Sequence, residues 1–268
     1  MAIPVSVIVV TKNEAGRIGR CLAALKDFDE VIVVDSQSTD ATQALARESA
    51  AHFVDFIWNG QYPKKRQWCL DYLRLAHEWV FFVDADEIVT PELVAEIRAL
   101  NFTAAGYFVR GRYIYDGKAL RFGLCNNKLA LIDRRKMEFP VVDDLDLPAM
   151  GEIEGHYQPV LKPGYEAEKI QQLKAPLLHY AYDNPQGWYE RHERYAAWER
   201  GMNDRKAWPQ DLRLAKRIFK QLPGQPWAAF FHSYVFKRGF LDGAAGFNFA
   251  RSRYRYYRMI SMPGKDLA

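Results

Sequence analysis

The sequence predicts an α/β fold, in which a mixed, mainly parallel sheet is flanked by helices and followed by a helical C-terminal appendage. Short β-branched apolar runs alternate with amphipathic stretches over roughly the first 100 residues, which is typical of a parallel sheet covered on both faces. From about residue 185 the pattern becomes helical. We therefore expect one domain over residues 1–180 and a helical, basic and aromatic region over residues 181–268.

The hydrophobic pattern also predicts individual elements. Buried parallel strands are expected at residues 5–10, 31–34, 53–57 and 79–83. Helices are expected between them, including 63–77 and 91–100, and Thr90 is the expected N-cap of the second. Antiparallel strands are then expected at 106–115, 120–124 and 128–132. Residues 134–176 are irregular, and so long a loop more often forms part of a site than a plain connection.

The composition is that of an ordinary globular protein, with 49% hydrophobic and 26% charged residues. No apolar run reaches the roughly 20 residues that span a bilayer, and no secretory leader is expected. The three cysteines are widely spaced and form no Cys-x-x-Cys pair, so reduced thiols of a cytoplasmic protein are expected.

Charge is distributed unevenly along the chain. The net charge is +4, but residues 201–268 hold 13 Lys or Arg against 4 Asp or Glu. Such a basic segment favours an anionic partner such as phospholipid or nucleic acid, and a solvated basic face is the alternative.

A cluster of carboxylates ends the strand expected at residues 79–83. Asp84, Asp86 and Glu87 follow the apolar run directly. Asp84 and Asp86 are two residues apart, so on an extended backbone both side chains point the same way and can face one hard divalent cation. A helix cap or a solvated turn is the alternative interpretation.

Polar loops also follow the first two expected strands. Residues 11–14 follow the first, and Asp35 with residues 36–40 follows the second. A carboxylate at such a strand end can accept hydrogen bonds from a ribose or a base, although helix capping explains the Ser, Thr and Asn residues equally well. The first loop lacks the Gly-x-Gly-x-x-Gly turn of nicotinamide-dinucleotide domains, which argues against that class.

Four motifs together resemble the nucleotide-sugar-binding half of glycosyltransferase family 2. They are residues 7–14, residues 30–40, Asn59-Gly60 with Lys65-Arg66-Gln67, and residues 79–87. The resemblance implies a GT-A fold and a metal-dependent, inverting hexosyltransferase that uses a nucleotide-sugar donor, with UDP favoured and Mn or Mg as cofactor. A similarity of residues 240–247 to bacterial lipopolysaccharide-core and polysaccharide sugar transferases implies a membrane-borne glycan or lipid-linked acceptor.

The resemblance also implies roles for particular residues. Donor binding is expected at Thr11, Asn13, Glu14, Asp35, Ser38, Lys65, Arg66, Asp84 and Asp86. The metal is expected at Asp86, near Asp84 and His179, and a satisfied core histidine is the alternative for His179. The general base is expected in the irregular acidic loop, where Glu154 and Glu152 rank before Asp144.

Aromatic and cationic residues alternate in the last segment, residues 227–258. Aromatic bodies with cationic heads suit the headgroup layer of an anionic membrane, so a peripheral location on the inner face of the cytoplasmic membrane is expected. Ordinary helix packing or a homodimer interface is the alternative. Nucleic acid is not expected as a partner, because the donor motifs give it no role.

Two other functions remain open from the residues alone. A nucleotidyltransferase that activates a sugar phosphate would usually carry a glycine-rich basic loop after its first strand, which residues 11–16 do not form. A non-catalytic nucleotide-sugar- or glycan-binding protein would bind the donor without turnover.

Overall fold

The computed structural model describes residues 1–49, 51–147, 150–154, 157–182, 185–206, 218–220 and 222–261. The chain forms two compact units. The first consists of Met1–Arg112, Asn126–Pro140 and Glu152–Tyr180, and the second of Tyr113–Cys125, Val141–Gly151 and Ala181–Ala268. The last change of unit thus falls after Tyr180, while two earlier segments group with the C-terminal helices.

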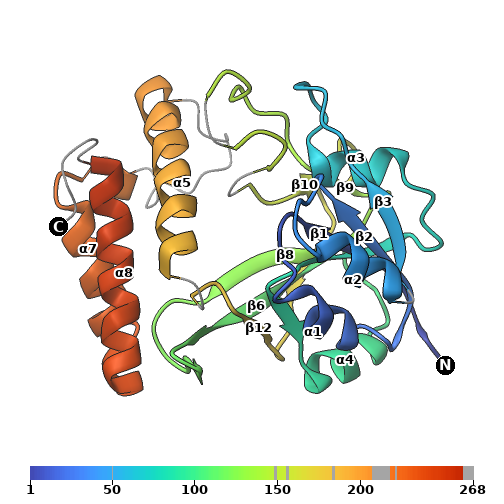
Figure 1. The fold of residues 1–268 in the computed structure, drawn as a ribbon, viewed down its shortest axis with the longest axis horizontal. Coiled ribbons are helices and arrows are strands. Elements are labelled where there is room, and N and C mark those ends of the chain that lie inside the picture. The colour runs from blue at the N-terminus through green and yellow to red at the C-terminus, as the bar shows by residue number, and fades with distance from the viewer. Residues whose placement is uncertain are drawn as a thin grey trace. The chain divides into compact units, whose positions relative to one another are not determined.

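A mixed sheet forms the centre of the first unit (Figure 1). Its order is β3-β2-β1-β4-β8-β6-β12-β5, and β11 pairs with β6. The pairs β1/β2, β2/β3 and β1/β4 are parallel, whereas β8 is antiparallel to both β4 and β6. The strands are β1 (Ile3–Thr11), β2 (Phe28–Asp35), β3 (His52–Asp55), β4 (Trp79–Asp84), β5 (Glu87–Val89), β6 (Gly106–Tyr115), β8 (Asn126–Asp133), β11 (Ile170–Gln172) and β12 (Leu177–His179). A separate antiparallel pair is formed by β9 (Met137–Glu138) and β10 (Val160–Leu161).

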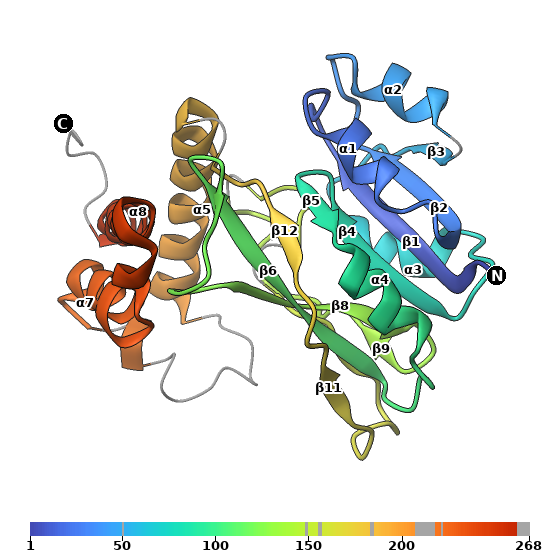
Figure 2. The same cartoon turned by 90° about the horizontal axis from the view of Figure 1, so that it is seen from below.

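Helices cover both faces of this sheet (Figure 2). On one face, α1 (Ile18–Ala23), α2 (Thr42–Glu48) and α4 (Pro91–Arg98) pack in one core with Val7 and Val9 of β1. On the other face, α3 (Lys65–Tyr72) packs in a second core with Ile8. Because both faces are buried, the central strands are continuously apolar. The predicted fold class is confirmed.

Two elements of the first unit follow the prediction to different degrees. Thr90 caps α4 as expected, because its Oγ1 accepts the Leu93 N–H at 3.2 Å. The helix expected over residues 63–77 is shorter, since α3 ends where Leu73 adopts an extended backbone conformation.

The second unit is largely helical, as predicted for the C-terminal region. Its elements are α5 (Pro185–Arg205), α7 (Gln225–Phe231), the π-helix η1 (His232–Phe236), the 3₁₀ helix η2 (Gly239–Asp242), α8 (Gly243–Ser261) and the short strand β7 (Lys118–Ala119), which pairs with the end of β6. Trp188 and Ala196 of α5 pack with Tyr256, Met259 and Ile260 of α8. In the described part of the chain, no helix is both long enough and apolar enough to cross a membrane.

The strand expected at residues 120–124 is not formed. The N–H groups of Arg121 and Phe122 donate to the Asp242 carboxylate at 3.1 and 2.8 Å, and Gly123 lies in the left-handed region at φ 79°. The backbone donors are therefore used by a side chain 120 residues away in the sequence, which no local pattern reveals.

Candidate active site

Three polar residues lie at the carboxyl ends of neighbouring parallel strands. Thr11 of β1 is in register with Asp35 of β2, and Val10 of β1 is in register with Asp84 of β4. In open α/β sheets, ligands bind beyond this edge. The sheet thus brings together the three loops that the sequence marks separately.

The loops after β1 and β2 are held to each other by side chains. The Asn13 N–H donates to Ser38 Oγ at 2.7 Å, and Asn13 Oδ1 accepts the Thr39 N–H at 2.8 Å. Asp35 is fully buried and its Oδ2 accepts the N–H of Ser38 at 2.7 Å and an amide hydrogen of Gln43 at 3.0 Å. Three of the predicted nucleoside contacts therefore also shape the loops, and their part in donor binding stays a prediction.

Thr11 and Glu14 complete this group. The Thr11 hydroxyl is buried and, in the part of the chain that the structure describes, has no hydrogen-bond partner. An orphaned buried hydroxyl is costly, so a ligand group beyond β1 would satisfy it. Glu14 pairs with Arg17 at 2.7 Å, and its N–H donates to Thr42 Oγ1 at 2.8 Å.

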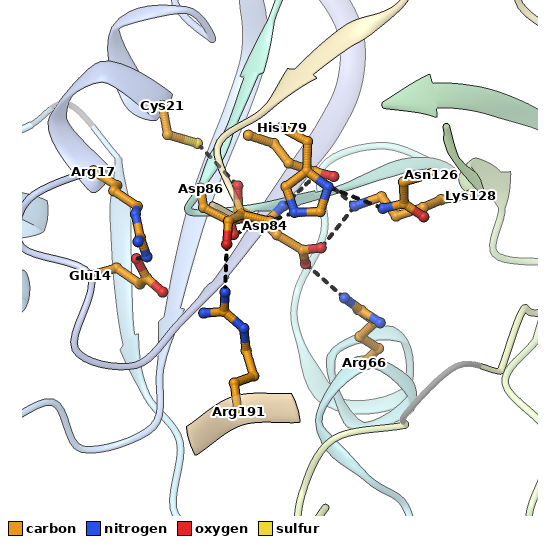
Figure 3. Close-up of polar contacts among 12 residues, drawn as sticks. Glu14, Arg17, Cys21, Arg66, Asp84, Asp86, Asn126, Lys128, His179 and Arg191 are labelled. Carbon is orange, nitrogen blue, oxygen red and sulfur yellow. Dashed lines mark hydrogen bonds and ion pairs between the residues drawn. The ribbon is translucent and has the colours of Figure 1, made fainter. Parts of the chain in front are cut away.

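The acidic turn after β4, which contains Asp84, Asp86 and Glu87, is contacted by two cationic side chains of the protein. Arg66 Nη2 lies 2.7 Å from Asp84 Oδ1, and Lys128 Nζ lies 2.9 Å from Asp84 Oδ2 (Figure 3). Lys128 also lies 2.5 Å from Glu87 Oε2, which in turn accepts the Asp84 N–H at 2.9 Å. Arg66, expected to lie against the base or diphosphate, thus contacts the first carboxylate of the turn.

These contacts set the protonation states. Burial alone would raise the pKa of Asp84, but Lys128 and Arg66 outweigh it and hold that pKa far below its ordinary range. Burial alone would lower the pKa of Lys128, yet Asp84 and Glu87 raise it. Both Asp84 and Lys128 are therefore charged at neutral pH.

Asp86, in the second half of the turn, lies beside His179 of β12. His179 Nε2 lies 3.4 Å from Asp86 Oδ2, and Asn126 Nδ2 lies 3.4 Å from His179 Nδ1. The pairing of β12 with β5 places His179 opposite Glu87. Burial opposes the charge of His179, but the Asp86 carboxylate prevails and raises its pKa.

The donor set is suited to a divalent ion only in part. In the described ranges, no group of three or more His, Cys, Asp or Glu is arranged to hold a metal. Asp86 and His179 offer one carboxylate and one imidazole, and Mg or Mn in such sites takes its other ligands from substrate phosphates and water. The residues thus fit a metal that is shared with a diphosphate.

The model of glycosyl transferase family 2 matches residues 6–147, which include the loops after β1, β2 and β4. The chain belongs to glycosyl transferase family 2.

Individual relatives match over shorter stretches. An uncharacterized glycosyltransferase of Rickettsia felis is 39% identical over 97 residues, covering 35% of this chain and 32% of that protein. The lipopolysaccharide core biosynthesis glycosyltransferase LpsC of Rhizobium meliloti is 31% identical over 118 residues, covering 41% of this chain and 43% of that protein. The matches thus span less than half the length of these curated relatives. Among solved structures, TarS 1–349 of S. aureus aligns over 97% of this chain and 90% of its own, with a TM-score of 0.44 and 18% identity.

In this family 2 chain, two of the predicted base residues lie at the start of α3. Glu154 is 3% exposed, and its Oε1 accepts the N–H groups of Arg66 at 2.5 Å and Gln67 at 3.1 Å. It therefore caps α3 from 88 residues away. Burial raises the pKa of Glu154 despite the nearby Arg66.

Glu152 and Asp144 have different surroundings. Glu152 Oε1 lies 3.7 Å from Lys65 Nζ. Burial would raise the pKa of Glu152, but its own N–H and the Lys65 ammonium hold it below its ordinary value. Asp144 lies in the second unit, where its Oδ2 accepts the indole N–H of Trp198 at 3.0 Å. The role of each as a base stays a prediction.

Sequence reasoning missed Lys128, Asn126 and the function of Glu87 within the turn. Lys128 and Asn126 were placed only in or beside an antiparallel strand. A lysine that opens the otherwise apolar run 129–132 was the available signal, because a lysine on a buried strand needs a carboxylate partner.

The Glu154 cap can be tested by stability. Glu154→Ala removes the acceptor for two N–H groups of α3 and should lower the free energy of unfolding by about 1–3 kcal/mol, measured by urea denaturation. Glu154→Gln keeps a carbonyl acceptor and should lose less. Glu48→Ala, at the exposed end of α2, should change stability by no more than about 0.5 kcal/mol. Equal stability of Glu154→Ala and the wild type would show that Glu154 is not a cap.

Proposed function

We propose that the protein is an inverting, metal-dependent glycosyltransferase that moves a sugar from a nucleotide-sugar donor, with UDP favoured, to a membrane-borne glycan or lipid-linked acceptor. The observation that carries this proposal is the convergence of the loops after β1, β2 and β4 at one sheet edge in a family 2 chain.

In this proposal the loops after β1 and β2 hold the nucleoside. Thr11, Asn13, Glu14, Asp35 and Ser38 are its contacts, and the buried Thr11 hydroxyl would gain the partner it lacks among the described residues. Lys65 and Arg66 lie at the start of α3, where cations would stabilise the base or the diphosphate.

Asp86 and His179 would hold Mn or Mg, and Asp84 would lie near the ribose and the metal. A bound divalent ion offsets the negative charge that develops on the departing nucleoside diphosphate. Arg66 and Lys128 keep Asp84 ionised and oriented. The residues of the turn are thereby held in place before the donor arrives.

The acceptor hydroxyl attacks the anomeric carbon from the side opposite the diphosphate, so the configuration inverts. The C–O bond to the diphosphate breaks as the new glycosidic bond forms, and the hydroxyl proton passes to a carboxylate. Glu154 and Glu152 are our first candidates for that base, and Asp144 is the next. Burial raises the pKa of Glu154, which makes its carboxylate a stronger proton acceptor.

We propose a membrane-borne acceptor, as in the synthesis of bacterial cell-surface polysaccharide or lipopolysaccharide. Similarity to LpsC, a lipopolysaccharide core biosynthesis glycosyltransferase, supports this choice. The exposed aromatic and basic residues of the second unit are a separate observation in favour of a membrane-borne acceptor.

That surface, formed by α7, η1, η2 and the start of α8, exposes large apolar side chains. Phe236 is 77% exposed and Trp227 is 57% exposed, and Trp227, Phe230, Phe231, Tyr234, Phe240 and Phe247 are linked by ring contacts. Exposed aromatic patches of this kind mark interaction surfaces. We call Phe236 and the six residues linked by ring contacts the aromatic face.

The charge of the same segment favours an anionic membrane as the partner. Residues 225–261 carry six Lys or Arg and one acidic residue, Asp242. The Asp242 carboxylate accepts backbone N–H groups. A second copy of the chain would bring two segments of the same net charge together, which like-charge repulsion opposes. We therefore propose a peripheral protein on the inner face of the cytoplasmic membrane, with a homodimer as the competing arrangement.

The donor site is tested by calorimetric titration of UDP, GDP, CDP, dTDP and ADP with Mn²⁺ present and with Mn²⁺ chelated. One nucleotide should bind in a metal-dependent way, and Asp86→Ala should weaken that binding at least about 100-fold because it removes a metal ligand. Asp29→Ala, an exposed carboxylate paired with His77, is the matched control and should bind as the wild type does. Binding of no nucleotide would contradict the proposal, and binding without sugar transfer would indicate a non-catalytic relative.

The base is tested by transfer of labelled sugar from the donor to a bacterial membrane glycolipid fraction. Glu154→Gln or Glu152→Gln should lower kcat by about 100-fold or more while nucleotide binding is retained, because only proton removal is lost. Glu48→Gln serves as the control. Wild-type rates in both variants would shift the assignment to Asp144, tested as Asp144→Asn.

Membrane binding is tested by sedimentation with vesicles of phosphatidylcholine alone or mixed with phosphatidylglycerol. The wild type should prefer the anionic vesicles. Phe236→Ala should weaken partitioning about tenfold because it removes one inserted aromatic side chain. Tyr72→Ala, which alters a 64% exposed aromatic residue of the first unit, should have no effect. A wild type that ignores both vesicles and elutes as a dimer would replace the membrane with a homodimer interface.

A further inference from the structure

Lys128 is a charged residue to which the family resemblance assigned no role. It lies near the start of β8, two residues after Asn126, and its side chain is 15% exposed. Its ammonium contacts Asp84 Oδ2 at 2.9 Å and Glu87 Oε2 at 2.5 Å. Because a buried charge is costly without partners, these two contacts explain why a lysine is stable there.

Glu87 fixes this ammonium to the backbone of the acidic turn. Its side chain is fully buried, and its Oε2 accepts the Asp84 N–H as well as the Lys128 ammonium. Arg66 holds the other oxygen of Asp84. Arg66 and Lys128 therefore contact Asp84 (Figure 3), and Lys128 also contacts Glu87. The third carboxylate of the turn, Asp86, lies 3.4 Å from His179 Nε2.

These contacts determine the net charge that the turn presents to a metal ion. Arg66 and Lys128 offset two of the three carboxylate charges of Asp84, Asp86 and Glu87, and the third carboxylate, that of Asp86, lies beside His179. A divalent ion is held weakly where so little net negative charge and so few ligands are available. The diphosphate of a nucleotide brings both further charge and further oxygen ligands.

We propose that Lys128 is an internal counter-ion that makes metal binding conditional on the nucleotide. With Lys128 in place, the acidic turn attracts a divalent ion strongly only when a diphosphate is bound beside it. Lys128 positions Asp84 and Glu87 and does not itself contact the reacting atoms. This role rests on the proposed function, because it requires a site that binds a nucleotide diphosphate with a metal.

The test measures free Mn²⁺ by electron paramagnetic resonance during titration of the intact protein, first alone and then with saturating UDP or the diphosphate selected by calorimetry. The wild type should bind Mn²⁺ at least about tenfold more tightly with the nucleotide than without it. Lys128→Gln raises the negative charge of the turn, so its nucleotide-free affinity for Mn²⁺ should rise at least about tenfold. Lys128→Arg keeps the charge and should behave as the wild type does.

Lys174→Gln, which alters an exposed lysine of the same unit, is the matched control, and circular dichroism checks the fold of each variant. If Lys128→Gln does not fold, Arg66→Gln removes the other cation and should shift the affinity in the same direction. Tight binding of Mn²⁺ to the nucleotide-free wild type, or unchanged affinity in a folded variant that lacks one cation, would overturn the role of Lys128. A wild type that binds neither Mn²⁺ nor any nucleotide would overturn the proposed function as well.

Discussion

The carboxylate of Asp84, held between Arg66 and Lys128, is the interaction on which the rest of the site depends. Arg66 comes from α3, Asp84 from the end of β4 and Lys128 from β8. The three charged side chains are only 15–27% exposed, and a charge so far removed from water is costly without a partner. The ion pairs therefore connect a helix and two strands around the acidic turn. A substitution at one of the three residues removes a charge partner from the others.

The start of α3 connects this turn to the acidic loop. The Arg66 side chain contacts Asp84, while the Arg66 N–H donates to Glu154. One residue thus joins the proposed metal turn to a proposed base. Because the unpaired N–H groups of a helix N-terminus favour a negative partner, the same feature that stabilises Glu154 as a cap also keeps a carboxylate close to the donor edge.

In the second unit, some aromatic residues form a buried core and others lie on the surface. Trp188 and Tyr256 are buried and form a core between α5 and α8. Most of the aromatic face is instead exposed, namely Trp227, Phe231, Phe236, Phe240 and Phe247, and the segment that carries it is rich in cations. Burial of Trp188 and Tyr256 stabilises the unit. Exposure of the aromatic face to water is unfavourable, and binding to a partner surface would remove that apolar area from water.

Much of the first unit could be predicted without coordinates. The continuous apolar runs of β1, β2 and β4 indicate buried strands, and the Asp84 turn and the Thr90 cap follow from local spacing. The partners of Lys128 and Glu154 could not be predicted, because they lie 44 and 88 residues away in the sequence. The missing strand at residues 120–124 has the same cause, since Asp242 takes its backbone donors. Periodicity and spacing thus determined the elements and the carboxylates, whereas only the tertiary structure decided which charges meet, because pairing of buried charges depends on proximity in space and not in sequence.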